Sequence, residues 1–126
     1  MVFDTGIMPM VVERATDDDI AALKDILERQ RAALKDRSYS MTLSAEFHAR
    51  VAACTHNLAI EMLVQSFHGP LLMSLREAQV VAPLMGHRGN TEHTDFVAAV
   101  ARRDVEAATA IMRKHLQRTA DRVAKP

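Results

Sequence analysis

Apolar residues along most of this chain recur every three or four positions, which is the spacing of the buried face of an α-helix. The clearest example lies between residues 17 and 35, with apolar positions at Ile20, Leu23, Ile26, Leu27 and Leu34. Thr16 precedes three consecutive aspartates. A threonine N-cap accepts a hydrogen bond from a free amide of the first turn, and acids there oppose the helix dipole. The pattern predicts a helix that begins after Thr16 and ends near Lys35.

The same periodicity predicts helices at residues 42–54, from Leu58 to Phe67, from about residue 90 and again from Val105. Gly69 and Pro70 should kink or interrupt the helix from Leu58 to Phe67, because proline has no amide donor for the preceding turn. The helical pattern then resumes over residues 71–80. No alternating pattern of a β-strand is present. We therefore expect an all-α bundle.

Two segments lack this periodicity. Residues 83–90 hold two glycines and a proline and are predicted to form a loop. Residues 1–10 contain Gly6 and Pro9 and are predicted to form an irregular N-terminal arm, in which Pro9 can start a helical turn. The domain proper is then expected to span residues 11–126.

Composition restricts the class of protein. The 126 residues are enough for one domain, 48% of them are hydrophobic, and 16 basic residues balance 16 acidic ones. A neutral chain lacks the positive field of an autonomous nucleic-acid binder. Cys54 is the single cysteine, which excludes an internal disulfide, and we expect it to be a small core residue. No apolar run approaches the roughly 20 residues of a membrane helix. These features predict a cytoplasmic protein without a membrane contact.

Candidate chemistry is concentrated in His48, His93 and His115, which fall on three different predicted helices. Each lies on or beside the predicted apolar face of its helix. A buried imidazole is unfavourable unless it is hydrogen-bonded or coordinated, and neutral imidazole is the commonest metal ligand among side chains. If the three converge, they form a metal site with an open coordination position. Taken singly, the spacing of each favours a hydrogen-bonded or half-exposed histidine over a metal ligand.

Other metal chemistries lack their motifs. There is no His-Glu-x-x-His motif of a zinc protease and no Glu-x-x-His motif of a di-iron bundle. The remaining histidines are His56 and His68, beside helix breaks, and His87, in the glycine-rich segment. All three are expected at the surface.

Several segments, taken in order, resemble the FadR C-terminal (FCD) type of effector-binding domain in GntR-family transcription regulators. They are residues 13–23, Glu46-Phe47-His48, residues 55–58, Glu92-His93, residues 98–104 and residues 112–116. The resemblance implies an antiparallel bundle of about six helices that binds small organic acids or related metabolites in a central cavity. In many members a divalent metal is held there by one aspartate and three histidines.

Carried over to this chain, the resemblance places the three metal-binding histidines at His48, His93 and His115. The aspartate normally lies four residues before the first histidine, where this chain has Ser44. A serine hydroxyl is a poor ligand for zinc-like ions, but three histidines still suffice for Zn²⁺ or Ni²⁺ with open positions. A small carboxylate would then fill an open position.

Further contacts to that carboxylate are assigned to basic or polar side chains near the histidines. The candidates are Arg14, Arg50 and Asn57. Asn57 is alternatively a cap for the helix that follows it.

The family normally carries an N-terminal winged helix-turn-helix domain, which this sequence does not contain. The chain is therefore expected to contact DNA only through such a domain, and to form a homodimer. Its predicted role is that of a ligand-sensing domain and not an enzyme. The first alternative is a degenerate dimerisation module that has lost both metal and effector. A metal-dependent hydrolase is the second, but Glu92, the base it would need, is expected to face away from His93.

Overall fold

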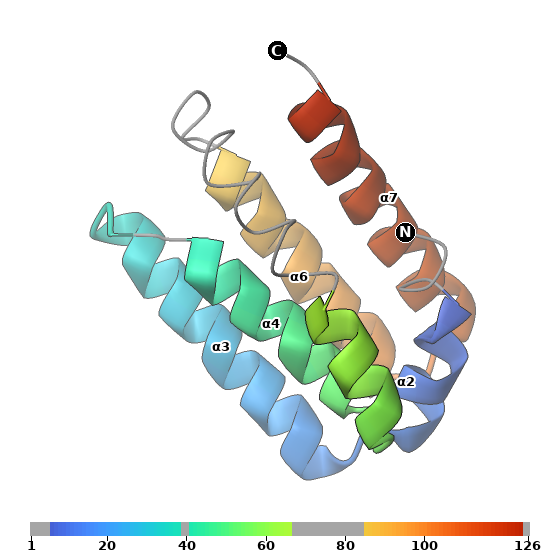
Figure 1. The fold of residues 1–126 in the computed structure, drawn as a ribbon. Coiled ribbons are helices and arrows are strands. Elements are labelled where there is room, and N and C mark those ends of the chain that lie inside the picture. Colours follow the sequence, from blue (N-terminus) through green and yellow to red (C-terminus); the bar gives the residue numbers. More distant parts are fainter. Residues whose placement is uncertain (1–5, 39–40, 67–84, 125–126) are drawn as a thin grey trace.

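Helices make up most of the described structure (Figure 1). The computed structural model describes residues 6–38, 41–66 and 85–124, and for residues 41–42, 85–89 and 119–124 it describes the backbone alone. Within these ranges no residue belongs to a strand, which confirms the predicted all-α class. The helices are α2 (Met8–Arg14), α3 (Asp17–Lys35), α4 (Met41–Ala53), α6 (Met85–Ala101) and α7 (Val105–Ala124), with a further helical stretch at residues 58–66.

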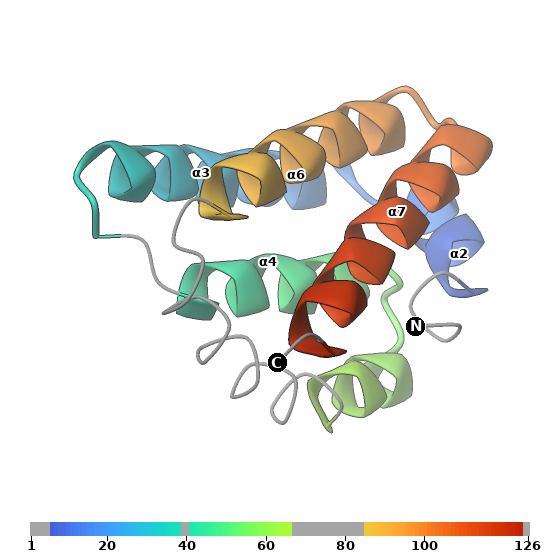
Figure 2. The same cartoon turned by 90° about the horizontal axis from the view of Figure 1, so that it is seen from above.

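The long helices form an antiparallel bundle. α3 lies between α4 and α6 and runs opposite to both, and α7 runs back along α6 (Figures 1 and 2). The short helix α2 packs on α7 and on α6. The backbone of α4 packs mainly on α3, so the space between α4, α6 and α7 is filled by side chains. No helix of the described residues is long and apolar enough to cross a membrane.

Helix α3 begins and ends where its sequence provides caps. The Thr16 hydroxyl accepts from the Asp19 amide at 3.1 Å, and the Asp19 carboxylate accepts from the Thr16 amide at 2.8 Å. This capping box confirms the predicted N-cap. At the other end, the Ser38 amide donates to the Ala33 carbonyl and Arg37 adopts a positive φ of 59°. That is the geometry of a Schellman motif, with an arginine at the position that usually favours glycine.

The core is aliphatic, with Phe47 and Phe96 as its largest members. Cys54 is fully buried within it, as expected of a small core residue. The fully or largely buried apolar side chains are Ile7, Met8, Val11, Val12, Ala15, Ile20, Leu23, Ile26, Leu27, Phe47, Val51, Ala52, Cys54, Val64, Phe96, Val97, Ala99, Val100, Ala108, Met112 and Leu116. They come from every helix, including α2, so that short helix is an integral part of the domain.

The predicted loop at residues 83–90 is wrong where the structure describes it, because α6 already begins at Met85. Gly86 and Gly89 each disfavour a helix by roughly 1 kcal/mol relative to alanine, which packing can offset. Asn90 supplies part of that packing: its side-chain amide donates to the Leu27 carbonyl of α3 at 3.4 Å. Tertiary contacts thus outweigh the local preference.

The helical turn that Pro9 was expected to start, within the arm of residues 1–10, is present. α2 begins at Met8, and Pro9 occupies its first turn, where a missing amide hydrogen costs nothing. Ile7 and Met8 are already part of the buried core. The remaining predictions for residues 67–84, including the interruption at Gly69 and Pro70, lie outside the described residues.

Candidate metal centre

The three predicted histidines meet between α4, α6 and α7. His48 lies on α4, His93 on α6 and His115 on α7. The Nε2 atom of His115 lies 3.2 Å from Nε2 of His48 and 3.2 Å from Nε2 of His93. One ring nitrogen of each histidine lies within 4.8 Å of the other two. The convergence that the sequence suggested is therefore present.

Aromatic packing fixes the orientation of these rings. Phe47, the residue before His48, stacks on His93 with ring centroids 4.0 Å apart and an interplanar angle of 12°. The His48 and His115 rings are also stacked, at 5.2 Å and 20°. His93 and His115 are buried, and His48 is partly buried. The imidazoles thus sit in an interior site with few alternative rotamers.

Protein acceptors engage the outer nitrogens of two of the rings. The Gln30 Oε1 atom lies 3.1 Å from Nδ1 of His93, and the Glu92 Oε1 atom lies 2.7 Å from Nδ1 of His115. An ionised carboxylate has no hydrogen to donate, so the His115 Nδ1 atom carries the proton in this contact. In a neutral ring whose single proton lies on Nδ1, Nε2 is the nitrogen with a free lone pair, and it is the atom that can bind a metal.

Electrostatics favour neutral His93 and ionised Glu92. Burial, followed by the charge of His115, lowers the pKa of His93 well below its ordinary value. Burial by itself would raise the pKa of Glu92, but the hydrogen bond from His115 and the charges of His115, Arg118 and Lys114 outweigh it and lower that pKa. Arg118 also donates directly to the Glu92 carboxylate. Neutral imidazole is the form that binds a metal.

The donor set fits a small divalent cation. A tetrahedral zinc site with Zn–N bonds near 2.05 Å has its nitrogens about 3.3 Å apart, and both Nε2 separations here are 3.2 Å. Two neutral nitrogens with facing lone pairs repel at this distance unless a proton or a cation lies between them. Ser44 is buried one helical turn before His48, and it adds no charge. In their neutral forms the three imidazoles would supply three nitrogen donors and no negative charge.

The three residues that were predicted to contact the effector form hydrogen bonds to other parts of the protein. Arg14 donates to the Thr55 carbonyl at 3.0 Å, Arg50 donates to Asp19 at 2.9 Å, and Asn57 accepts from the Ile60 amide at 3.2 Å. The cap predicted for Asn57 is confirmed. These contacts tie α2, α3 and the turn after α4 together. In them, none of the three predicted residues bonds to the histidines.

Asp19 is the centre of that junction. Its carboxylate is almost fully buried and accepts from Arg50, from His56 at 2.7 Å and from the Thr16 amide. Burial would raise its pKa, but the bonds from Thr16 and His56 outweigh this and lower the pKa below the usual value. His56 itself is half exposed, as predicted, whereas His68 and the side chain of His87 lie outside the described residues.

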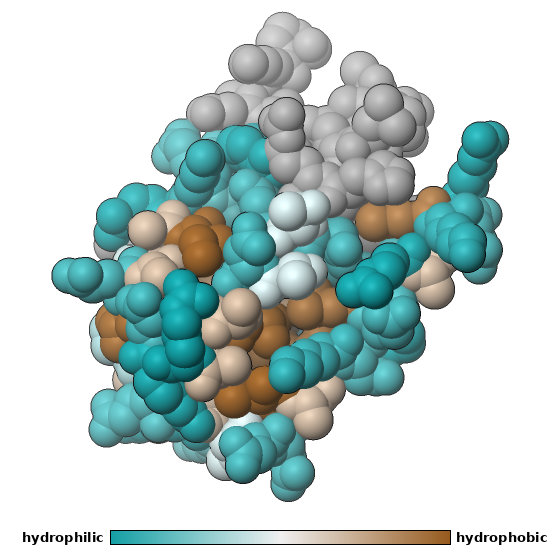
Figure 3. Space-filling model, turned by 180° about the vertical axis from the view of Figure 1, so that it is seen from behind, coloured by the Kyte–Doolittle hydropathy of each residue, from teal (hydrophilic) through white to brown (hydrophobic). Residues whose placement is uncertain are grey.

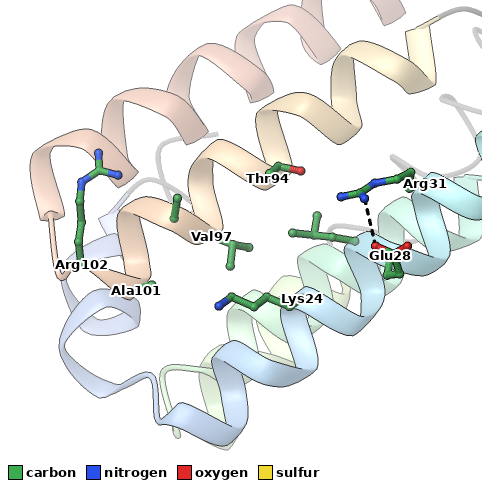
Figure 4. A pocket seen from close by; sticks show the side chains of 9 residues that line it. Lys24, Glu28, Arg31, Thr94, Val97, Ala101 and Arg102 are labelled. Carbon is green, nitrogen blue, oxygen red and sulfur yellow. Dashed lines mark ion pairs between the residues drawn. The ribbon is translucent and has the colours of Figure 1, made fainter.

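A groove of about 630 Å³ lies on a different face, between α3 and α6 (Figure 4). Leu27 and Val97 form its buried floor, and Lys24, Arg31 and Arg102 stand around it, with Arg31 paired to Glu28 at 3.4 Å. The molecular surface seen from behind shows apolar residues between longer polar ones (Figure 3). None of the lining residues belongs to the histidine cluster, so this groove is separate from it.

Sequence reasoning missed the residues behind the histidine rings. Gln30 is fully buried in α3 and lies three residues after Leu27 and four before Leu34. A polar side chain on an apolar stripe was the available signal. Glu92 was expected to face away from His93, and it does meet a different histidine, His115. Which ring it would contact depends on the packing of α6 on α7.

Comparison with known proteins assigns the chain to a family. The family model of the FCD domain matches residues 3–118, which is nearly the whole sequence. No curated protein matched the chain. The match agrees with the all-helical fold and with the order of the segments that resemble this family. The chain therefore belongs to the FCD family, the effector-binding domains of GntR-type transcription regulators.

Proposed function

We propose that this chain senses a small organic acid through a divalent cation, Zn²⁺ or Ni²⁺, held by Nε2 of His48, His93 and His115. When bound, the cation supplies a Lewis-acidic coordination position for the carboxylate of the effector. The observation that carries the proposal is the meeting of three Nε2 atoms, with that of His115 lying 3.2 Å from those of His48 and His93. The bonds from Gln30 and Glu92 to the outer nitrogens support it.

Charge favours an anionic effector. Three neutral imidazoles leave both positive charges of the cation uncompensated, and Ser44 contributes none of the balancing charge that an aspartate would supply. In a buried site an uncompensated charge is unfavourable, so an incoming carboxylate gains more than a neutral ligand of the same shape. Arg14, Arg50 and Asn57 are the proposed additional contacts, and each would have to exchange a partner that it has in this structure.

The test is a metal analysis of the purified protein, followed by calorimetric titration with Zn²⁺ and Ni²⁺. We expect about one equivalent of metal per chain. His48→Ala, His93→Ala and His115→Ala should each weaken binding by more than tenfold. His56→Asn is the matched control, because it removes an imidazole outside the cluster and asparagine tolerates the positive φ of 52° at this position.

Effector binding is then measured with L-lactate and succinate as probes. The loaded protein should bind at least one of these acids more tightly than the metal-free protein does, and it should melt at a higher temperature with that acid present. A protein that takes up neither metal, or whose binding of Zn²⁺ survives loss of all three histidines, would refute the proposed site.

Ser44 favours one alternative, a domain that has lost sensing and serves as a homodimerisation module. Under that alternative, replacing all three histidines would leave the dimer and its thermal stability unchanged, and Zn²⁺ would have no effect on either. Sedimentation of the wild type and of the triple variant, with and without Zn²⁺, separates the two functions. We expect a homodimer in both cases, with a metal-dependent gain in stability in the wild type.

A further inference from the structure

The histidine cluster is backed by two polar side chains that would not touch the metal. We infer that Gln30 and Glu92 are positioning residues, which hold the protons of His93 and His115 on Nδ1 and so direct both Nε2 lone pairs to the same point. The inference rests on the proposed metal site for its function. Its structural part, the assignment of the two tautomers, can be tested without any metal.

The amide of Gln30 has one orientation in this packing. Its Nε2 atom donates to the Leu43 carbonyl of α4 at 3.1 Å. The Oε1 atom therefore faces the other way, where it also accepts from the side-chain amide of Asn90 at 3.1 Å. A flipped amide would place donor against donor at Asn90 and acceptor against acceptor at Leu43. Because Oε1 can only accept, the Nδ1 atom of His93 must donate to it.

Glu92 controls His115 in the same way and adds a charge. Its Oε1 atom accepts from Nδ1 of His115 at 2.7 Å, and Arg118 donates to the same oxygen. Arg118 is three residues after His115 on α7, so one helix supplies both donors to the carboxylate. A carboxylate behind a ligating imidazole makes that imidazole a stronger donor. Glu92 thus brings a negative charge one hydrogen bond away from a site whose own ligands have none.

This arrangement bears on the serine at position 44. The family's aspartate would place its negative charge on the metal itself, whereas Ser44 is neutral and buried. In this chain the carboxylate nearest to the ligand nitrogens in the described contacts is that of Glu92, behind His115. We therefore expect metal affinity to depend on Glu92 for charge as well as for orientation, and on Gln30 for orientation alone.

Three variants separate these effects. Glu92→Gln keeps an acceptor for His115 but removes the charge, Glu92→Leu removes both, and Gln30→Met removes the acceptor for His93 at similar volume. Zn²⁺ affinity, measured by competition with a chromophoric chelator, should fall about tenfold for Glu92→Gln and for Gln30→Met, and up to about 100-fold for Glu92→Leu, which removes both effects. Glu46→Gln is the matched control, because Glu46 is an exposed partner of Arg29 two residues before His48.

A second readout is the tautomer of each ring in the metal-free protein, from long-range proton–nitrogen NMR correlations of the histidines. Protons on Nδ1 of both His93 and His115, with His93 losing this preference in Gln30→Met and His115 in Glu92→Leu, support the inference. A wild type with these tautomers that binds no Zn²⁺ would refute the proposed function and leave the positioning intact. A wild type that binds Zn²⁺ but lacks the Nδ1 proton on His93 or His115, or variants that bind Zn²⁺ as tightly as the control, would overturn the inference.

Discussion

Replacing Asp19 by asparagine should destabilise this domain more than any change at the neighbouring exposed acids. The side chain of Asp19 is only 4% exposed, and its carboxylate accepts from Arg50 at 2.9 Å, from His56 at 2.7 Å and from the Thr16 amide at 2.8 Å. Asparagine retains the shape but has one acceptor fewer, and its amide group would oppose one of these donors. The substitution therefore leaves one of these donors facing an amide NH2 group in place of a carboxylate oxygen.

The magnitude follows from what each partner can recover. Breaking a fully buried ion pair costs about 3–5 kcal/mol, but the Arg50 and His56 side chains are 36% and 50% exposed and regain some hydration. Loss of the acid from the capping box adds about 0.5–1 kcal/mol. Together these give a loss of roughly 2–3 kcal/mol in the free energy of unfolding. For a chain of this length that corresponds to a decrease of about 10 °C in Tm.

The assay is urea unfolding at constant pH with linear extrapolation to water, run beside Asp18→Asn. Asp18 occupies the same first turn but is exposed, so its loss should cost roughly 0.5 kcal/mol. Equal midpoints for the two variants would contradict the account. A double-mutant cycle of Asp19→Asn with Arg50→Met should give a coupling energy of at least about 1 kcal/mol, and additive effects would show that the two residues do not interact.

The pH dependence has a definite sign. Asp19 has a pKa in the folded protein below its usual value of 3.8, so it binds a proton less readily when folded than when unfolded. Its ionisation therefore contributes stability that is fully present above about pH 4 and is lost as the pH falls through the lowered folded-state pKa. The difference between wild type and Asp19→Asn should shrink below pH 4. A difference that grows with acidification would have the wrong sign.

Three more outcomes follow from the structure. Burial, and then the charge of Asp19, raise the pKa of Cys54 to about 12, against a smaller lowering by Arg50. A thiol reagent at pH 8 should therefore modify the native protein far more slowly than the urea-unfolded chain. Equal rates of modification would contradict the burial of Cys54. Arg37→Gly should raise the free energy of unfolding by about 0.5–1 kcal/mol, measured in urea, because glycine adopts the φ of 59° without strain. A lower free energy of unfolding would mean that the arginine side chain stabilises the turn. Phe47→Leu should lower the free energy of unfolding by about 1–2 kcal/mol and weaken Zn²⁺ binding, because it removes the ring stacked on His93. An unchanged Zn²⁺ affinity in calorimetry would show that the stacking does not orient His93.

The parts of the fold that depend on residues close together along the chain could be predicted from the sequence. Thr16 and the acids after it marked the start of α3, and apolar periodicity placed α4 within one residue of its observed bounds at Met41 and Ala53. The predicted start of α6 was wrong. Its glycines favour a loop when only the local sequence is considered, whereas the contact from Asn90 to α3 involves a residue far away along the chain. Local signals cannot include that contribution.

The residues of the candidate site also fall into those that the local sequence indicates and those that depend on other helices. His48, His93 and His115 each showed on their own helix that they lie near the buried face, and the family's order of segments suggested that they meet. Gln30 and Glu92 were missed because their partners sit on other helices. Which nitrogen a carboxylate meets is decided by helix rotation and by rotamers, and neither leaves a periodic signal in the sequence.

Gln30 also determines which parts of the bundle can move independently. Its single amide joins the middle of α3 to the Leu43 carbonyl of α4 and to two residues of α6, His93 and Asn90. Sliding either helix along α3 would break these hydrogen bonds in a buried place where no solvent replaces them. α3, α4 and α6 are thereby locked in one register at this level. A change in the spacing between His93 and His115 would accordingly be taken up as a shift of α7 against a fixed three-helix body.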